Sequence, residues 1–246
     1  MDAKDYKKSV IEIGKKAFED VKKRTSSEMS NNKSLMIEFA RHGELYSKNE
    51  EIRLMIVGRA TGCFDEEKED CRVIECENGN QINEERLKHC FEDYNENDHL
   101  NWIHSQDVRK GNKYIDSFSF FSFSKKVYLA LMRQEQDYEW FKKICYTNMF
   151  KIISTKGGNP SVKLRNAQKG KMLEIMKVEI DYYKPTHILV LDSRTTKNHC
   201  WHDEEFRECL KEYVQKVGAK ISFSDRPERR EHDPLLEVVK ADFELK

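Results

Sequence analysis

Short apolar runs that alternate with helical segments constrain the fold of this chain more than any other feature. The run IRLMIVG at 52–58 ends in glycine, and a second run at 188–191 follows a Lys-Pro pair that stops the preceding helix. Unbroken apolar runs of this length are typical of parallel strands buried on both faces. Two further strands are predicted at 144–148 and 219–223.

Segments with apolar residues three or four apart lie between these runs and predict helices. The predicted helices cover 3–24, a short segment through Phe39, 84–94, a segment from the SFSFF motif through Met132, 169–183, 204–217 and 234–240. This alternation favours an α/β fold, a three-layer α/β/α sandwich with a central four-stranded parallel sheet. We expect a single domain over 1–246 with a helical N-terminal extension over 1–45.

Charge, cysteine content and hydropathy limit the class of protein. The 44 basic and 44 acidic residues cancel, so a polyanion site would have to be a local basic patch. The seven cysteines are scattered and odd in number, which suits free thiols in a reducing cytoplasm. No run reaches the roughly 18 apolar residues that span a bilayer, and the N-terminal 16 residues lack a hydrophobic signal region. We therefore expect a cytoplasmic protein without a membrane partner.

The segments that follow the four predicted strands carry the polar chemistry. They read GRATGCFDEE, TNMFKIISTKGGNP, DSRTTKNHCWH and SDRPERREHDP. Ligands of open α/β sheets bind beyond the carboxyl ends of the strands. A functional site that combines amide, acid, guanidinium and glycine is therefore expected at this edge of the sheet.

The order of these segments resembles that of the uracil-DNA glycosylase superfamily over roughly residues 50–240. The matching pieces are GRATG, YTNMFKI, GGNP, EIDYYKP, HILVLDS and, after the last strand, SDRPERR. The resemblance implies the fold of that superfamily and a monofunctional DNA glycosylase. Such an enzyme flips a base out of DNA and hydrolyses its N-glycosidic bond, which leaves an abasic site.

Two departures from the superfamily pattern bear on the substrate. Ala60 stands where the superfamily has a water-activating Asp or Asn, although some branches have Ala there, and the resemblance places Arg226 at the position of the final histidine. These changes favour a modified pyrimidine over uracil. Some bacterial members of the wider superfamily act against phage by removing hypermodified cytosines such as glucosylated hydroxymethylcytosine.

Catalysis is expected to involve an amide and a carboxylate. Asn148 offers one acceptor and two donors, enough to read the Watson–Crick edge of an extruded base; the alternative is that it caps a turn. The oxocarbenium-like transition state calls for a carboxylate. Asp65 and Glu66 are the first candidates, because an acidic pair follows the first motif in one branch of the superfamily, and Asp116 is the next. For each acid, the alternative is a solvated surface carboxylate.

The resemblance also implies residues that hold the base and the DNA. Phenylalanines at 120, 121 and 123 fall where the superfamily has a ring that stacks on the flipped base; the alternative is core packing. The residues expected at the base are Gly58, Arg59, Ala60, Gly62, Phe120, Phe121, Phe123 and Arg226. Those expected on the DNA backbone are Asn159, Ser161, Lys163, Arg229 and Arg230. Leu235 or Leu236 would wedge into the duplex or, alternatively, belong to the core.

Metal and cofactor signals are weak. The nearby cysteines lack the compact C-x₂-C element of iron–sulfur sites, and HCWH at 199–202 lacks an evident fourth zinc ligand. The cysteines in question are Cys63, Cys71, Cys76 and Cys90. Neither a P-loop nor a dinucleotide fingerprint is present. We expect no metal and no cofactor. The alternatives to a glycosylase are a catalytically silent nucleic-acid-binding module on the same fold and a nucleotide or nucleoside hydrolase.

Overall fold

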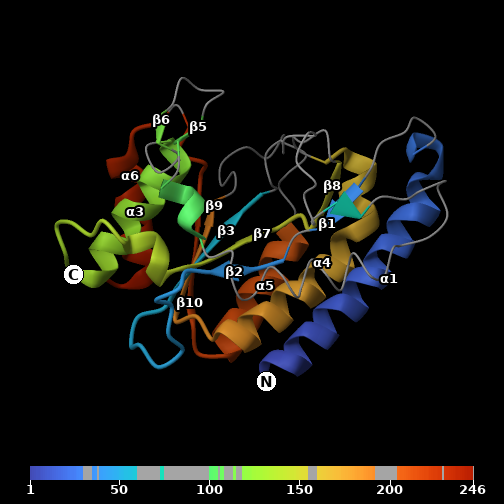
Figure 1. The fold of residues 1–246 in the computed structure, drawn as a ribbon. Helices are drawn as coiled ribbons and strands as arrows, with labels where there is room; N and C mark the ends of the chain where they lie inside the picture. Colours follow the sequence, from blue (N-terminus) through green and yellow to red (C-terminus); the bar gives the residue numbers. More distant parts are fainter. Residues whose placement is uncertain are drawn as a thin grey trace. The chain divides into compact units, whose positions relative to one another are not determined.

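The computed structural model of the chain has a mixed α/β fold with a five-stranded, mostly parallel sheet (Figure 1). It describes residues 1–29, 35–37, 39–59, 73–74, 100–104, 106–107, 113–114, 118–154, 160–191, 204–228 and 230–245. The chain divides into two compact units. The first comprises 1–40, 59–97 and 148–182, and the second comprises 41–58, 98–147 and 183–246. The single domain expected from the sequence stays a prediction.

The five-stranded sheet has the strand order β10-β9-β3-β7-β2. Its strands are β2 (Arg41–His42), β3 (Leu54–Gly58), β7 (Cys145–Asn148), β9 (His187–Leu191) and β10 (Lys220–Ser224). β9 pairs in parallel with both β3 and β10, so that Leu189 lies opposite Ile56 on one side and Ser222 on the other. The four predicted strands are thus confirmed. β2 adds a fifth strand that runs antiparallel to β7, so the expected four-stranded, wholly parallel sheet is corrected.

Helices cover both faces of the edge strand β10 in the second unit. The helices of this unit are α3 (Ser119–Met132), α5 (Glu204–Lys216) and α6 (His232–Phe243), with 3-10 helices η2 (Leu100–His104) and η5 (Trp140–Lys143). The hydroxyl of Ser222 donates to Asp242 of α6 at 2.7 Å, whereas the ring of Phe223 lies 4.5 Å from the guanidinium of Arg207 of α5. Successive side chains of a strand point to opposite faces, so α6 and α5 lie on opposite faces of β10.

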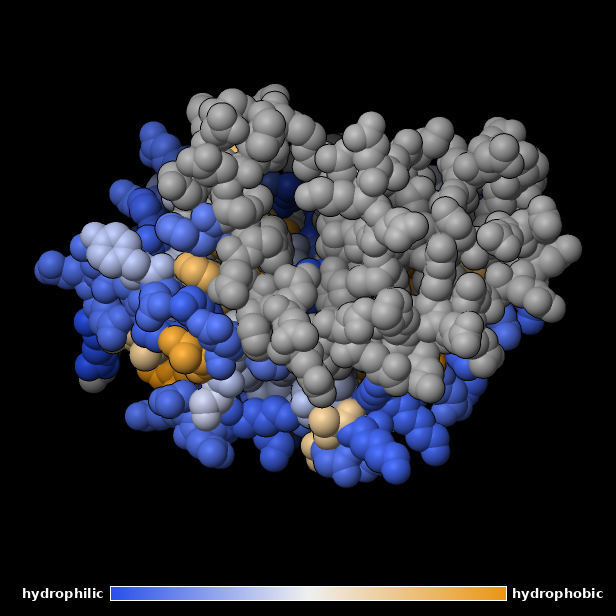
Figure 2. All heavy atoms as spheres, viewed as in Figure 1, coloured by the Kyte–Doolittle hydropathy of each residue, from blue (hydrophilic) through white to orange (hydrophobic). Residues whose placement is uncertain are grey.

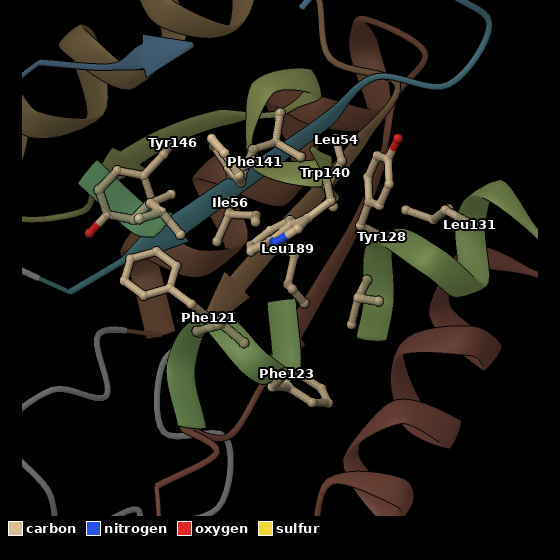
Figure 3. Packing of buried hydrophobic residues seen from close by; sticks show 14 of the residues in the cluster. Leu54, Ile56, Phe121, Phe123, Tyr128, Leu131, Trp140, Phe141, Tyr146 and Leu189 are labelled. Atoms are coloured by element: carbon tan, nitrogen blue, oxygen red, sulfur yellow. The ribbon is translucent and has the colours of Figure 1, made fainter. Parts of the chain in front are cut away.

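A hydrophobic core gathers around Trp140, whose side chain is fully buried (Figure 3). Leu54 and Ile56 of β3 share one face of the sheet with Leu189 of β9, and side chains from α3, η5 and α6 pack against them. Burying an apolar side chain of this size contributes about 1.5–3 kcal/mol. This face of the sheet is therefore a large source of stability for the second unit. A short pair, β5 (Gln106–Asp107) and β6 (Lys113–Tyr114), forms a separate two-stranded sheet.

The first unit combines two long helices with a three-stranded antiparallel sheet. Its elements are α1 (Ala3–Met29), β1 (Leu35–Ile37), β4 (Val73–Ile74), β8 (Ile152–Ser154) and α4 (Val162–Tyr183, whose last residue belongs to the second unit). β1 is the central strand and pairs with β4 and β8. Phe18 and Val21 of α1 join Ile37 and Ile152 in a second buried cluster.

Most of the predicted helices are confirmed by α1, α3, α4, α5 and α6, and α4 begins seven residues earlier than predicted. The short helix predicted through Phe39 is wrong. Residues 35–37 form strand β1, because hydrogen bonding to strands on both sides outweighs the local preference. The helix predicted at 84–94 lies outside the described residues.

On the face seen in Figure 2, the described residues are mainly hydrophilic, with small scattered apolar groups. This agrees with a chain in which 36% of the residues are charged. Within the described ranges, no helix has the length and apolar character needed to cross a membrane.

Candidate functional site

The strand ends of β3 and β7 are joined by a backbone hydrogen bond. Asn148 is the last residue of β7, and only 1% of its surface is exposed. Two residues on, the N–H of Phe150 donates to the carbonyl of Arg59 at 2.8 Å. Arg59 follows Gly58, the last residue of β3, so the segments that leave these strands lie side by side. Buried carboxamides are almost always hydrogen-bonded. A base that binds Asn148 must therefore displace the groups that hydrogen-bond to its carboxamide in this structure.

A buried ion pair lies directly after this strand end. The Lys151 ammonium lies 2.8 and 2.7 Å from the two carboxylate oxygens of Glu179 on α4, and neither side chain has exposed surface. The same carboxylate accepts the backbone N–H of Ala40 at 2.8 Å. Gln168, also on α4, accepts the N–H of Ile152 at 2.8 Å and donates to its carbonyl at 2.7 Å. Three side chains thus fix the segment between β7 and β8.

Lys151 and Glu179 are candidate functional residues that the sequence predictions missed. Lys151 is the one charged residue in the stretch from Ile144 to Ile153, which is a usable signal. Glu179 falls on the buried stripe of α4 beside Ile180, where a carboxylate is unusual.

Aromatic side chains from the first turn of α3 gather around Tyr146 of β7 in the second unit. The Phe120 and Phe121 rings meet edge to face with centroids 4.9 Å apart, and the Tyr146 ring lies 6.2 and 6.0 Å from them. Figure 3 shows Phe121 and Tyr146 facing each other at the edge of the core. Phe120 is half-buried and can offer part of its ring to a ligand. Phe123 is fully buried and packs edge-on against His232, so the core-packing alternative describes it well.

The loop after β10 holds two ion pairs. Arg230 lies 2.8 Å from the buried carboxylate of Asp225, and Arg226 pairs with Glu228 two residues along the chain. Both guanidinium groups are partly exposed. A DNA phosphate or a base that binds either arginine must therefore compete with a carboxylate already in place.

His232, the first residue of α6, is a further candidate that the sequence predictions passed over. Burial lowers the pKa of its imidazole, and the nearby Lys126 ammonium lowers it further, against the opposing effect of Asp233. The ring is thereby kept neutral at pH 7 and can both donate and accept a hydrogen bond. Its place next to Asp-Pro, in the segment after the last strand, is the sequence signal that could have found it.

The structure describes only some of the remaining predicted site residues. Ser161 and Lys163 are exposed at the start of α4, where the Ser161 hydroxyl accepts the N–H of Leu164 at 3.2 Å and so caps the helix. Leu235 and Leu236 pack against the core of the second unit, in line with the core alternative. The positions outside the described residues are Ala60, Gly62, Asp65, Glu66, Asp116, Asn159, Arg229, the four clustered cysteines and the HCWH motif. The part of the chain that is described holds no group of three or more potential metal ligands.

A surface hollow of about 280 Å³ lies where α5, β10 and α6 meet in the second unit. None of the predicted site residues lines it. Its lining mixes three acids, two bases and two apolar side chains: Glu204, Arg207, Glu208, Lys211, Ile221, Phe223 and Asp242.

No protein-family model matches the chain, and no curated protein matches it. The roles of the candidate residues therefore rest on their own chemistry and geometry.

Proposed function

We propose that the protein is a cytoplasmic, monofunctional DNA glycosylase with a three-layer α/β/α fold like that of the uracil-DNA glycosylase superfamily. Its substrate is a modified pyrimidine in DNA, and phage glucosylated hydroxymethylcytosine is the preferred candidate. The observation that supports this most is the buried Asn148 at the end of β7, where an open α/β sheet binds ligands. The mostly parallel sheet, with helices on both faces of β10, is compatible with this fold.

Asn148 has the hydrogen-bonding groups to recognise the base. Its carbonyl oxygen accepts from the exocyclic N–H of a cytosine, and its NH₂ group donates to the ring nitrogen beside it. A carboxamide turned by 180° presents the opposite pattern, which suits uracil. The groups that hold the amide therefore decide which pyrimidine is accepted.

Water then replaces the base at C1′ of the deoxyribose. The bond between C1′ and the base nitrogen breaks, and the base leaves with the bonding electrons while the sugar passes through an oxocarbenium-like state. A carboxylate stabilises that state and takes up the proton of the attacking water, a role we assign to Asp65, Glu66 or Asp116. The half-buried ring of Phe120 supplies a stacking surface for the extruded base, worth about 1–3 kcal/mol.

Base release from defined duplexes tests this proposal. We would incubate the protein with DNA that contains glucosylated hydroxymethylcytosine, hydroxymethylcytosine, uracil or unmodified cytosine, and would then cleave the abasic sites with alkali. We expect release from a modified cytosine, with strands intact until alkali is added. Asn148→Ala should lower the rate by about 100-fold or more, whereas Asn49→Ala, at an exposed asparagine, should leave it unchanged. Absence of release from every duplex would refute the proposal.

A catalytically silent nucleic-acid-binding module is a second candidate, favoured by Ala60 at the position of the water-activating residue. Variants at the three acids separate the two. If Asp65→Asn, Glu66→Gln or Asp116→Asn abolishes release and leaves DNA binding intact, the protein is an enzyme. Binding to modified DNA without release by the wild type would identify the module instead.

A further inference from the structure

The ion pair between Lys151 and Glu179 joins two separate connections of the chain. Lys151 lies between β7 and β8, whereas Ala40 lies between β1 and β2. Glu179 accepts from both, through the Lys151 ammonium and the Ala40 N–H. β1 pairs with β8 and β2 pairs with β7, in both cases antiparallel. One carboxylate of α4 therefore binds both the β1–β2 connection and the β7–β8 connection. The strands that these two connections join pair with each other.

This geometry fixes the register of the segment that carries Asn148. Successive side chains of a strand alternate between faces, so a slip of one residue would turn Asn148 to the opposite face. Lys151 lies three residues further along the chain, after a bend at Met149, and Glu179 holds its ammonium there. A buried ion pair is costly to break, and a slipped register would pull the Lys151 ammonium away from the Glu179 carboxylate. Apolar neighbours such as Met149 and Phe150 discriminate less between the native and a slipped register, because one apolar side chain can occupy the place of another.

We propose that Lys151 and Glu179 are positioning residues that hold Asn148 in the register and orientation needed to bind the extruded base. The inference rests on the proposed glycosylase function. Neither residue touches the base; both act through the backbone between 148 and 152. Gln168 supports them by binding the N–H and the carbonyl of Ile152.

The test removes both charges and leaves the packing in place. In the double variant Lys151→Met/Glu179→Gln, the glutamine still accepts the N–H of Ala40. The matched control is Lys171→Met/Glu174→Gln, which removes an exposed pair, 2.7 Å apart, from the same helix. Each pair of changes is made in the wild type and in Asn148→Ala, and kcat and KM for base release are measured on the modified duplex.

We expect the double variant to fold and to lose about 100-fold in kcat, the usual consequence of a misplacement of about 1 Å, with a smaller change in KM. In the Asn148→Ala background the same changes should cost nothing further, since the positioned group is already absent. The control should retain full activity in both backgrounds. An equal loss in both backgrounds, or no loss in either, would overturn the inference.

A second measurement does not depend on activity. The side-chain NH₂ signals of Asn148 are identified in nitrogen-15 NMR spectra by their absence from Asn148→Ala, and hydrogen exchange is followed at the backbone amides of 148–152. The double variant should shift those signals and speed exchange there at least tenfold, with α6 unchanged. If this occurs while the wild type releases no base, the glycosylase proposal fails and Asn148 is still positioned by the pair. If signals and exchange stay as in the wild type, the positioning role is refuted.

Discussion

Replacing Lys151 alone should destabilise the protein far more than replacing a surface lysine. In Lys151→Met the methionine fills a similar volume, but the Glu179 carboxylate stays buried and loses the ammonium that bonds both of its oxygens. Removing one partner of a buried pair costs about 3–5 kcal/mol, because an uncompensated charge remains. Domains are stable by about 5–15 kcal/mol in total, so this single change consumes a large part of that margin.

The double variant Lys151→Met/Glu179→Gln should recover most of the loss. Both charges are gone, and the glutamine oxygen still accepts the N–H of Ala40, so this buried donor keeps its hydrogen bond. We expect its stability to lie within about 1 kcal/mol of the wild type, since a buried pair and well-packed neutral groups of similar volume are often equivalent. A strong non-additivity between the two positions is therefore the signature of the pair.

Urea unfolding at pH 7, followed by tryptophan fluorescence and by far-ultraviolet circular dichroism, measures these differences. With a slope of roughly 2–3 kcal/mol per molar urea, the single variant should unfold at a midpoint lower by about 1–2 M, and the double variant near the wild type. Lys171→Met, at an exposed pair on α4, should shift the midpoint by less than about 0.5 M. A Lys151→Met midpoint as close to the wild type as this control would show that the two charges are not buried together, and would refute the reasoning.

Three further predictions concern backbone space and pH. Gly43→Ala should cost more than about 3 kcal/mol or prevent folding, because a Cβ there would lie 2.2 Å from the backbone carbonyl of Lys142; a normal melting temperature would contradict this. Gly170→Ala, in an exposed part of α4 where a Cβ meets nothing within 4 Å, should stabilise by about 1 kcal/mol in the same thermal melt. Burial, and then the Lys220 ammonium, lower the pKa of His187 to about 4 from 6.5. The unfolded chain therefore takes up the proton first, and stability should fall as the pH drops from 6.5 towards 4. In His187→Phe that fall should be smaller, as urea midpoints at successive pH values will report.

The elements that the sequence predicted best are those whose signal is local. The apolar runs of β3 and β9 can be recognised as strands from the sequence, because few structures other than a buried strand accept five such residues in a row. The ends of α5 were predicted to within one residue, since its periodicity is clear and Gly218 follows it with φ +76°. By contrast, β1 and β2 are three and two residues long, and their strand conformation comes from pairing with β8 and β7. Strands this short have no local periodicity from which the sequence could predict them.

Asn148 was easier to predict from the sequence than Lys151 and Glu179, because its signal is local. A polar residue at the end of an apolar strand is visible in one stretch of sequence. The partnership of Lys151 with Glu179 joins positions 28 residues apart and exists only when α4 packs on the segment after β7. Each partner nevertheless left a signal of its own. Lys151 is a single charge inside an apolar run, and Glu179 lies on the buried stripe of α4 between Met176 and Tyr183. A buried charge is tolerated only beside its opposite. Lys151 is therefore expected to pair with a buried acid, and the packing of α4 on the segment after β7 selects Glu179.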